Sequence, residues 1–279
     1  MLDEMVRRAR ASGGKAVVVT FEPHPMRILR PDSAFKLLTP TPEKLLLLEQ
    51  TGVDAVLLLP FGRDISLMTA REFAEEILHK RLGAREVHEG QNFRFGHKAS
   101  GDMSSLETLG REMGFTTQEW PFLNLRGEPV SSSRIRELIS EGRVSRARAL
   151  LGRPFSIAGL PGRGRGFGTR YTVPTINLAR YDELIPRDGV YITFTRVGAE
   201  CFESVTNVGN RPTFGADSFA VESHLLDFRP LELTPETKVE IQFLDRLRDE
   251  VKFPSVEALR EQIGRDVSRA QRYFRLLGR

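Results

Sequence analysis

The segment from residue 162 to residue 178 combines the residue types that handle phosphates. It alternates glycines with other residues, many of them cationic, and ends in a hydroxyl and an amide: Gly162, Gly164, Gly166, Gly168, Arg170, Thr175 and Asn177. Glycines let a backbone approach phosphates closely, and arginines match their charge. A hydroxyl two residues before an amide oxygen can hold a hydrated Mg²⁺. We therefore predict a phosphate-binding loop with Thr175 and Asn177 as metal ligands.

This loop lacks both common nucleotide-binding signatures. The chain contains no GxxxxGK[ST], and no GxGxxG here runs from a strand into a helix. Glycine and arginine also make flexible linkers, so the glycine pattern alone leaves that alternative open. The segments that follow decide between the two.

Four short segments downstream are β-branched and aromatic and are separated by turn residues: 189–195, 202–208, 219–226 and 238–244. They predict an antiparallel β-barrel or sandwich. In the third segment Glu222 and His224 share one face of the strand. There the Glu222 carboxylate could accept the proton of a hydroxyl that attacks the γ-phosphate of a bound nucleotide. The alternative is a glutamate that simply faces solvent.

The chain ends in a predicted helix over 255–277, with Ser255 as its N-cap. An apolar stripe from Val256 and Leu259 to Phe274 should be buried against the barrel.

The first half of the chain alternates strands with helices. The expected order is strand 15–21, helix 42–51, strand 53–59, helix 69–82, strand 84–89, helix 102–113 and a strand near 115–120. This alternation predicts βαβ units in a doubly wound parallel sheet, with 15–21 as a buried strand. The pattern changes to strands alone at Gly152, so we place domains at 1–152 and 153–279.

Composition narrows the class of protein. The 279 residues carry a formal net charge of +4 with cationic and anionic side chains interleaved, which does not require a nucleic-acid partner. Cys201 is the single cysteine, as expected for a protein of the reducing cytoplasm. No apolar run is long enough to span a membrane.

Five motifs in order give the chain a family resemblance: PTIN at 174–177, DGVY at 188–191, NVGNRPTF at 207–214, VESHLLDF at 221–228 and FLDRLRDEVKF at 243–253. Together they resemble the riboflavin kinase module, which is usually fused to an N-terminal FMN adenylyltransferase in the bacterial bifunctional FAD synthetases. The resemblance covers nearly all of residues 15 to 275. It implies ATP, riboflavin and FMN as substrates, with Mg²⁺ as the cofactor.

The resemblance also assigns roles to individual residues. Glu222 is the expected base, and the glycine-rich loop with Thr175 and Asn177 is expected to hold Mg²⁺ and ATP. The remaining assignments are nucleotide phosphates for Ser132, Ser133 and Arg136, and flavin for Asn92, Phe93, Phe95, Arg248 and Phe253. From the residues alone, 131–136 is also simply a well-capped helix start, and Phe93 and Phe95 are equally candidates for core anchors.

The sequence departs from the family at two places. Thr169 and Thr172 stand where Arg and Gly are usual, so Arg170, or Arg163 and Arg165, would supply the missing charge. The family's GxFDGxHxGH stretch, whose histidines contact the α-phosphate during AMP transfer, is absent from the printed residues. We therefore expect FMN formation and little FAD formation. The alternatives are a flavin- or nucleotide-binding protein without catalysis, and a basic nucleic-acid-binding β-barrel.

Overall fold

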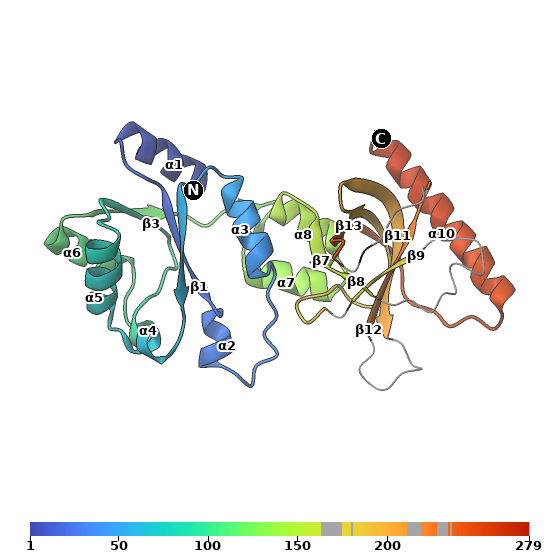
Figure 1. Ribbon diagram of the computed structural model, residues 1–279, viewed down its shortest axis with the longest axis horizontal. Coiled ribbons are helices and arrows are strands. Elements are labelled where there is room, and N and C mark those ends of the chain that lie inside the picture. The colour runs from blue at the N-terminus through green and yellow to red at the C-terminus, as the bar shows by residue number, and fades with distance from the viewer. Residues whose placement is uncertain (163–174, 180, 211–218, 228–233, 235, 279) are drawn as a thin grey trace. The chain divides into compact units, whose positions relative to one another are not determined.

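The computed structural model describes residues 1–162, 175–179, 181–210, 219–227, 234 and 236–278. They form two compact units, Met1–Pro129 and Val130–Arg279 (Figure 1). The second unit thus begins before the change of pattern at Gly152, because two helices precede its first strand.

The first unit follows the predicted alternation of helices and strands. Its elements are α1 (Leu2–Ala11), β1 (Val17–Glu22), α2 (Pro25–Leu29), α3 (Thr41–Glu49), β2 (Ala55–Pro60), α4 (Arg63–Leu67), α5 (Ala70–Phe73), η1 (Ala74–Arg81), β3 (Glu86–Gly90), η2 (His97–Ala99), α6 (Met103–Met113), β4 (Thr116–Trp120), β5 (Asn124–Leu125) and β6 (Glu128–Pro129). Strands β1 and β2 pair in parallel, as do β3 and β4. The parallel α/β class is therefore confirmed.

Strand β1 corrects one expectation. It was predicted to be buried, yet all six of its residues are only half-buried. Within the described residues it pairs with β2 alone, so one of its edges has no neighbouring strand in this sheet. A fully buried parallel strand has helices on both faces of its sheet, whereas a strand at a sheet edge also keeps one side open to solvent.

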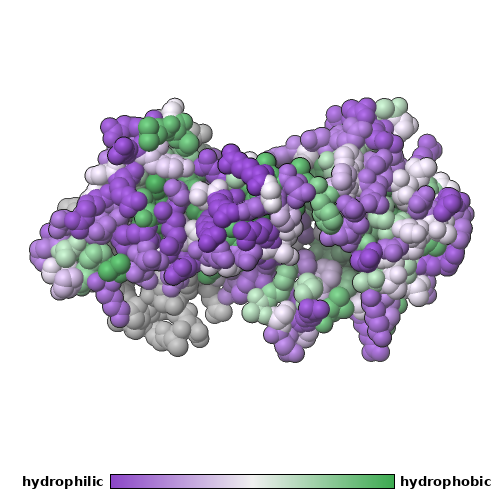
Figure 2. All heavy atoms as spheres, turned by 180° about the vertical axis from the view of Figure 1, so that it is seen from behind, coloured by the Kyte–Doolittle hydropathy of each residue, from purple (hydrophilic) through white to green (hydrophobic). Residues whose placement is uncertain are grey.

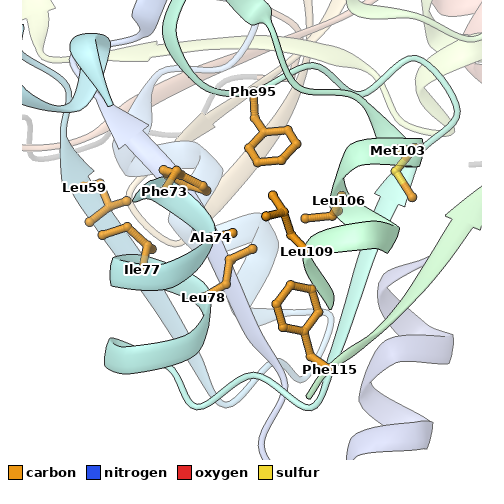
Figure 3. Packing of buried hydrophobic residues seen from close by; sticks show 10 residues of the cluster. All are labelled: Leu59, Phe73, Ala74, Ile77, Leu78, Phe95, Met103, Leu106, Leu109 and Phe115. Carbon is orange, nitrogen blue, oxygen red and sulfur yellow. The ribbon is translucent and has the colours of Figure 1, made fainter. Parts of the chain in front are cut away.

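The core of the first unit lies between the α5–η1 helices and α6 (Figure 3). Phe73, Ile77 and Leu106 meet there, and Phe95 closes one end of the cluster. Thr69 begins α5 with a capping box, since its side chain accepts from the Glu72 amide and Glu72 bonds back to the Thr69 amide. This cap fixes where the helix starts and therefore which side chains face the core.

The second unit starts with two helices and continues as an antiparallel sheet. Its elements are α7 (Ser132–Ser140), α8 (Val144–Leu151), β7 (Phe155–Gly159), β8 (Pro161–Gly162), β9 (Thr175–Leu178), β10 (Gly189–Val197), β11 (Glu200–Asn210), β12 (Phe219–Leu225), β13 (Val239–Arg248) and α10 (Val256–Leu276). The four predicted strands are therefore present as β10 to β13. The order in the sheet is β7-β13-β10-β11-β12-β9-β8.

The two ends of this order are neighbours in the chain. Strands β7 and β8 are separated by Leu160 alone, and β7 pairs with β13 while β8 pairs with β9. The Leu160 carbonyl also accepts from the Ala179 amide at 2.9 Å. One short segment thus bridges both ends of the sheet, which must curl round to meet it. The predicted antiparallel barrel follows from this connection.

Helix α10 covers one face of the curled sheet (Figure 1). Ser255 caps it as predicted, with its Oγ accepting from the Ala258 amide at 3.1 Å. Ala270 and Phe274 are buried against Ile192 and its neighbours. The predicted stripe is only partly correct, because Val256 is 49% exposed. The helix packs on the barrel through its second half.

Candidate functional site

Strands β8, β9, β12 and β11 bring several predicted site residues into one row. Asn177 of β9 is the register partner of Glu222 in β12 and of Gly162 in β8. Glu222 is in turn opposite Asn207 of β11. Residues directly opposite each other in an antiparallel pair have Cβ atoms about 4.5–5.5 Å apart and share a face. The predicted base and a predicted metal ligand are therefore immediate neighbours.

The row has polar side chains on the outer face of the barrel. Asn177 is 7% exposed and Glu222 is half-buried. Thr175 is exposed, two residues from Asn177, and is the register partner of His224. Thr175 and Asn177 thus share a face, as ligands of one cation would have to do. Glu222 is half-buried beside the buried Asn177 amide, so both its role as a base and the solvent-facing alternative stay open.

The donor set suits Mg²⁺. Thr175 and Asn177 offer a hydroxyl and an amide oxygen, and Glu222 adds a carboxylate to the same face. Over the described ranges there is no group of three or more His, Cys, Asp or Glu side chains that could hold a metal. Mg²⁺ commonly binds through few protein oxygens and takes its other ligands from water and substrate phosphates. The residues present therefore fit that ion when it arrives with a nucleotide.

Three residues of this neighbourhood were not assigned a role from sequence: Asn207, Gly209 and Glu250. Asn207 donates from Nδ2 to Glu250 Oε1 at 3.5 Å. Glu250 also lies against Gly209, where an added Cβ would be 2.4 Å from Glu250 Oε2. Glu250 is exposed, so a larger residue at 209 would displace its flexible carboxylate at little cost. Asn207 and Gly209 stand within the NVGNRPTF motif, but the register that places Asn207 beside Glu222 is visible only in the structure.

Arg248 and Phe253, both assigned to flavin, lie together. The Arg248 guanidinium is 5.6 Å from the centre of the Phe253 ring. Its Nη2 also pairs with Asp266 of α10 at 2.8 Å. Arg248 is connected to the row as well, since it is opposite Val190, which is opposite Asn207. The flavin role of Arg248 and Phe253 stays a prediction. The ion pair with Asp266 of α10 fixes the position of the Arg248 guanidinium.

Helix α7 carries the residues assigned to nucleotide phosphates. Ser131 is the N-cap, and its Oγ accepts from the Arg134 amide at 3.2 Å. Ser132 and Ser133 are exposed in the first turn, and Arg136 is half-buried. Burial lowers the pKa of the Arg136 guanidinium. Residues 131–136 therefore form a capped helix start, as the structural alternative expected. Their role in binding nucleotide phosphates stays a prediction.

The loop that follows β3 carries Asn92, Phe93 and Phe95. Asn92 is exposed and Phe93 half-buried. Phe95 is 8% exposed, stacks on Phe93 at 5.2 Å between ring centres and lies 6.1 Å from Phe73 (Figure 3). This burial supports the core-anchor alternative for Phe95, and its flavin assignment stays a prediction. Asn92 and Phe93 are the more exposed flavin-side candidates of this loop.

Four other predicted residues cannot be placed. Gly164, Gly166, Gly168 and Arg170 lie outside the described residues, together with Arg163, Arg165, Thr169 and Thr172. Gly162 is placed, and it joins the row through β8.

The fold and the row define a class: an α/β unit followed by a curled antiparallel sheet with a candidate phosphotransfer site. Residues 1–134 match the FAD synthetase family, and residues 151–274 match the riboflavin kinase family. The bifunctional riboflavin kinase/FMN adenylyltransferase of Pseudomonas fluorescens is 34% identical, over 97% of this chain and 86% of that protein. The enzyme of the same description from Escherichia coli K12 is 31% identical, over 99% of this chain and 88% of that protein. The chain belongs to the bifunctional riboflavin kinase/FMN adenylyltransferase family.

A solved structure supports the same architecture. A crystal structure described as a macrolide-efflux protein from Streptococcus pneumoniae superimposes with a TM-score of 0.86 at 27% identity, covering 96% of this chain and 88% of that one.

Among the described residues, none of the helices has the length and apolar character that a membrane span requires. The face shown in Figure 2 is mostly hydrophilic, with hydrophobic residues in smaller groups.

Proposed function

We propose that this protein transfers the γ-phosphate of ATP to the 5′-hydroxyl of riboflavin and so forms FMN. The observation that carries the proposal is the register pair of Glu222 and Asn177 on β12 and β9. It places a carboxylate beside oxygen donors, as a transfer between a hydroxyl and a nucleotide phosphate requires. Membership of the family supports the choice of riboflavin as the acceptor.

Each residue of the row has a defined task in this reaction. Glu222 accepts the proton of the ribityl 5′-hydroxyl as that oxygen attacks the γ-phosphorus, whose bond to the β–γ bridging oxygen breaks to release ADP. Thr175 and Asn177 hold Mg²⁺ with the ATP phosphates. The bound ion supplies neutralisation of the charge on the transferring phosphoryl group. Asn207 and Glu250 line the row beside Glu222 and restrict how the acceptor hydroxyl approaches.

The second activity of the family, transfer of AMP to FMN, would use residues of the predicted 1–152 domain. Asn92 and Phe93 are the flavin-side candidates there, and Ser132, Ser133 and Arg136 the phosphate-side candidates. The printed sequence contains no HxGH to stabilise the α-phosphate. Kinase activity is therefore the main function that we assign to these 279 residues. We also infer a cytoplasmic location, with small molecules and no nucleic acid as partners.

The test is direct. Purified protein is incubated with riboflavin, ATP and Mg²⁺, and the flavins are separated by chromatography. FMN should appear only when all three are present. If no FMN forms while circular dichroism shows a folded protein, the kinase assignment is wrong.

A further inference from the structure

Five hydroxyl side chains inside the barrel form a closed ring of hydrogen bonds. They are fully buried and come from β10, β11 and β12: Thr193, Thr195, Ser204, Thr206 and Ser223. Thr193 Oγ1 is 2.8 Å from Ser204 Oγ and 2.6 Å from Thr206 Oγ1. Ser204 Oγ is 2.8 Å from Thr195 Oγ1, and Thr206 Oγ1 donates to Ser223 Oγ at 3.0 Å. A bond between Thr195 and Ser223 closes the ring.

This ring is an unusual filling for a small barrel. A hydroxyl has one proton to donate, and each member can donate it within the ring or, for Ser204 and Thr193, to the carbonyl of the other residue at 3.0 and 3.3 Å. All five are then satisfied without water. Apolar side chains of the same shape would fill the space at no cost in desolvation. Unlike apolar packing, hydrogen bonds depend on the direction and distance between specific atoms. The hydroxyl ring can therefore favour one alignment of the strands over others.

This dependence on geometry matters because β12 could pair with its neighbours in more than one register. A shift of β12 by one residue would turn Glu222 into the barrel, and the alternation of buried and exposed side chains opposes it. A shift by two residues would keep that alternation and yet move Glu222 away from Asn177. The hydroxyl ring opposes the second shift, since Ser223 has ring partners only in the observed register.

The ring lies directly behind the candidate site. Ser223 follows Glu222 in β12, and Thr206 precedes Asn207 in β11. The inward pair Thr206–Ser223 is thus the next register pair to the outward pair Asn207–Glu222. Among the described residues, β12 pairs with β9 at three positions, compared with seven for its pairing with β11. We therefore expect the pairing of β12 with β11 to determine where Glu222 lies relative to Asn177.

We propose that the hydroxyl ring positions Glu222 for phosphoryl transfer, with Thr206 and Ser223 as positioning residues. The inference rests on the proposed function, since it assumes Glu222 as the base. Displacement of a catalytic group by about 1 Å can lower the rate on the order of 10²-fold. Loss of the ring should therefore lower kcat while both substrates still bind.

Two variants of one residue separate positioning from packing. Thr206→Val keeps the shape and removes the hydroxyl, whereas Thr206→Ser keeps the hydroxyl and leaves a small cavity. We expect Thr206→Val to lower kcat by about 10- to 100-fold, with both KM values changed by less than about twofold. Thr206→Ser should keep kcat within about threefold of the wild type, even where the cavity lowers its melting temperature more.

Thr195 gives a second test at a distance from the site. It bonds Ser223 from β10, so Thr195→Val can reach Glu222 only through the ring. It should lower kcat while Thr195→Ser does not. If kcat instead follows the melting temperature in all four variants, the ring is structural and the inference is wrong. Absence of FMN with the wild-type protein would overturn the proposed function itself.

Discussion

Arg248, the last residue of β13, and Asp266, in the middle of α10, form an ion pair that joins the barrel to its covering helix. Arg248 Nε and Nη2 lie 2.9 Å and 2.8 Å from the same carboxylate oxygen of Asp266. Gln262 donates to the other oxygen at 2.9 Å. The Asp266 side chain is 3% exposed, so this carboxylate depends on these partners in place of water.

Replacing Asp266 by Ala should therefore lower the free energy of unfolding of the second unit by about 3 kcal/mol, because a largely buried cation loses its partner. Chemical denaturation of the full chain measures the change. The matched control is Glu261→Ala in the same helix, which removes a pair of the same 2.8 Å length to Arg265 with both side chains exposed. That change should cost about 0.5 kcal/mol or less. Equal losses for the two variants would show that the Asp266 pair is not buried in solution.

Glu222→Gln should lower kcat for FMN formation by about 10² to 10⁴, the usual cost of losing a general base. Stability should change little, since the position is half-buried and the substitution keeps its size. Glu200→Gln, at an exposed position of β11, is the control and should leave kcat unchanged. Near-normal turnover of Glu222→Gln would place the proton acceptor elsewhere.

Thr175→Val and Asn177→Ala should each raise the concentrations of Mg²⁺ and ATP needed for half-maximal rate. Both remove an oxygen from the shared face of β9, and riboflavin affinity should change less. Initial rates at varied ATP and Mg²⁺, with flavin fluorescence for binding, separate the two effects. A collapse of flavin affinity alone would mean that the two substrates have been assigned to the wrong places.

The 279-residue polypeptide should convert FMN to FAD slowly or not at all, because it contains no HxGH to stabilise the α-phosphate. Incubation with FMN and ATP, followed by chromatography, measures this activity. The first histidines to examine as substitutes are His24, whose Nδ1 accepts from the Met26 amide at 3.2 Å, and His97, whose Nδ1 is 2.9 Å from the Ser66 carbonyl. Rapid FAD formation would contradict the prediction, and Ala at either histidine would then show which one acts.

Glu89 should make stability depend on pH. Burial raises the pKa of its carboxyl from 4.5 to about 7. The folded chain therefore holds a proton that the unfolded chain has already lost, so stability falls as the pH rises from 4.5 to about 7 and is level above. At pH 8, Glu89→Gln should be more stable than the wild type by on the order of 2 kcal/mol. Glu119→Gln, at the exposed register partner on β4, is the control in the same thermal denaturation series. Parallel pH curves for all three proteins would contradict the expected shift.

The sequence was sufficient for the fold class because its local patterns agree with the elements. The four β-branched and aromatic segments form β10 to β13 in the structure, and Ser255 caps α10 as predicted. The motifs also pointed to Asn177 and Glu222 separately. That the two are opposite each other depends on how β12 and β9 pair, and no local pattern states that pairing.

Other features depended on packing that a motif does not contain. The NFRFG stretch has aromatic residues suited to a flavin or to a core, and only the contact with Phe73 assigns Phe95 to the core. Val256 and Leu259 continue the apolar stripe of α10 but extend past the part of the barrel that the helix covers. The hydroxyl ring could not be foreseen either, since isolated Thr and Ser residues within strands are common.

The connection between β7 and β8 through Leu160 alone also affects which strand edges could pair with a second copy of this protein. A sheet whose first and last strands belong to one continuous segment has its ends turned toward each other, so it offers few unpaired backbone groups to another chain. Strand β1 is different, because within the described residues one of its edges has no neighbour in its sheet. Edge-to-edge pairing between copies would therefore involve β1 more readily than the strands of the barrel.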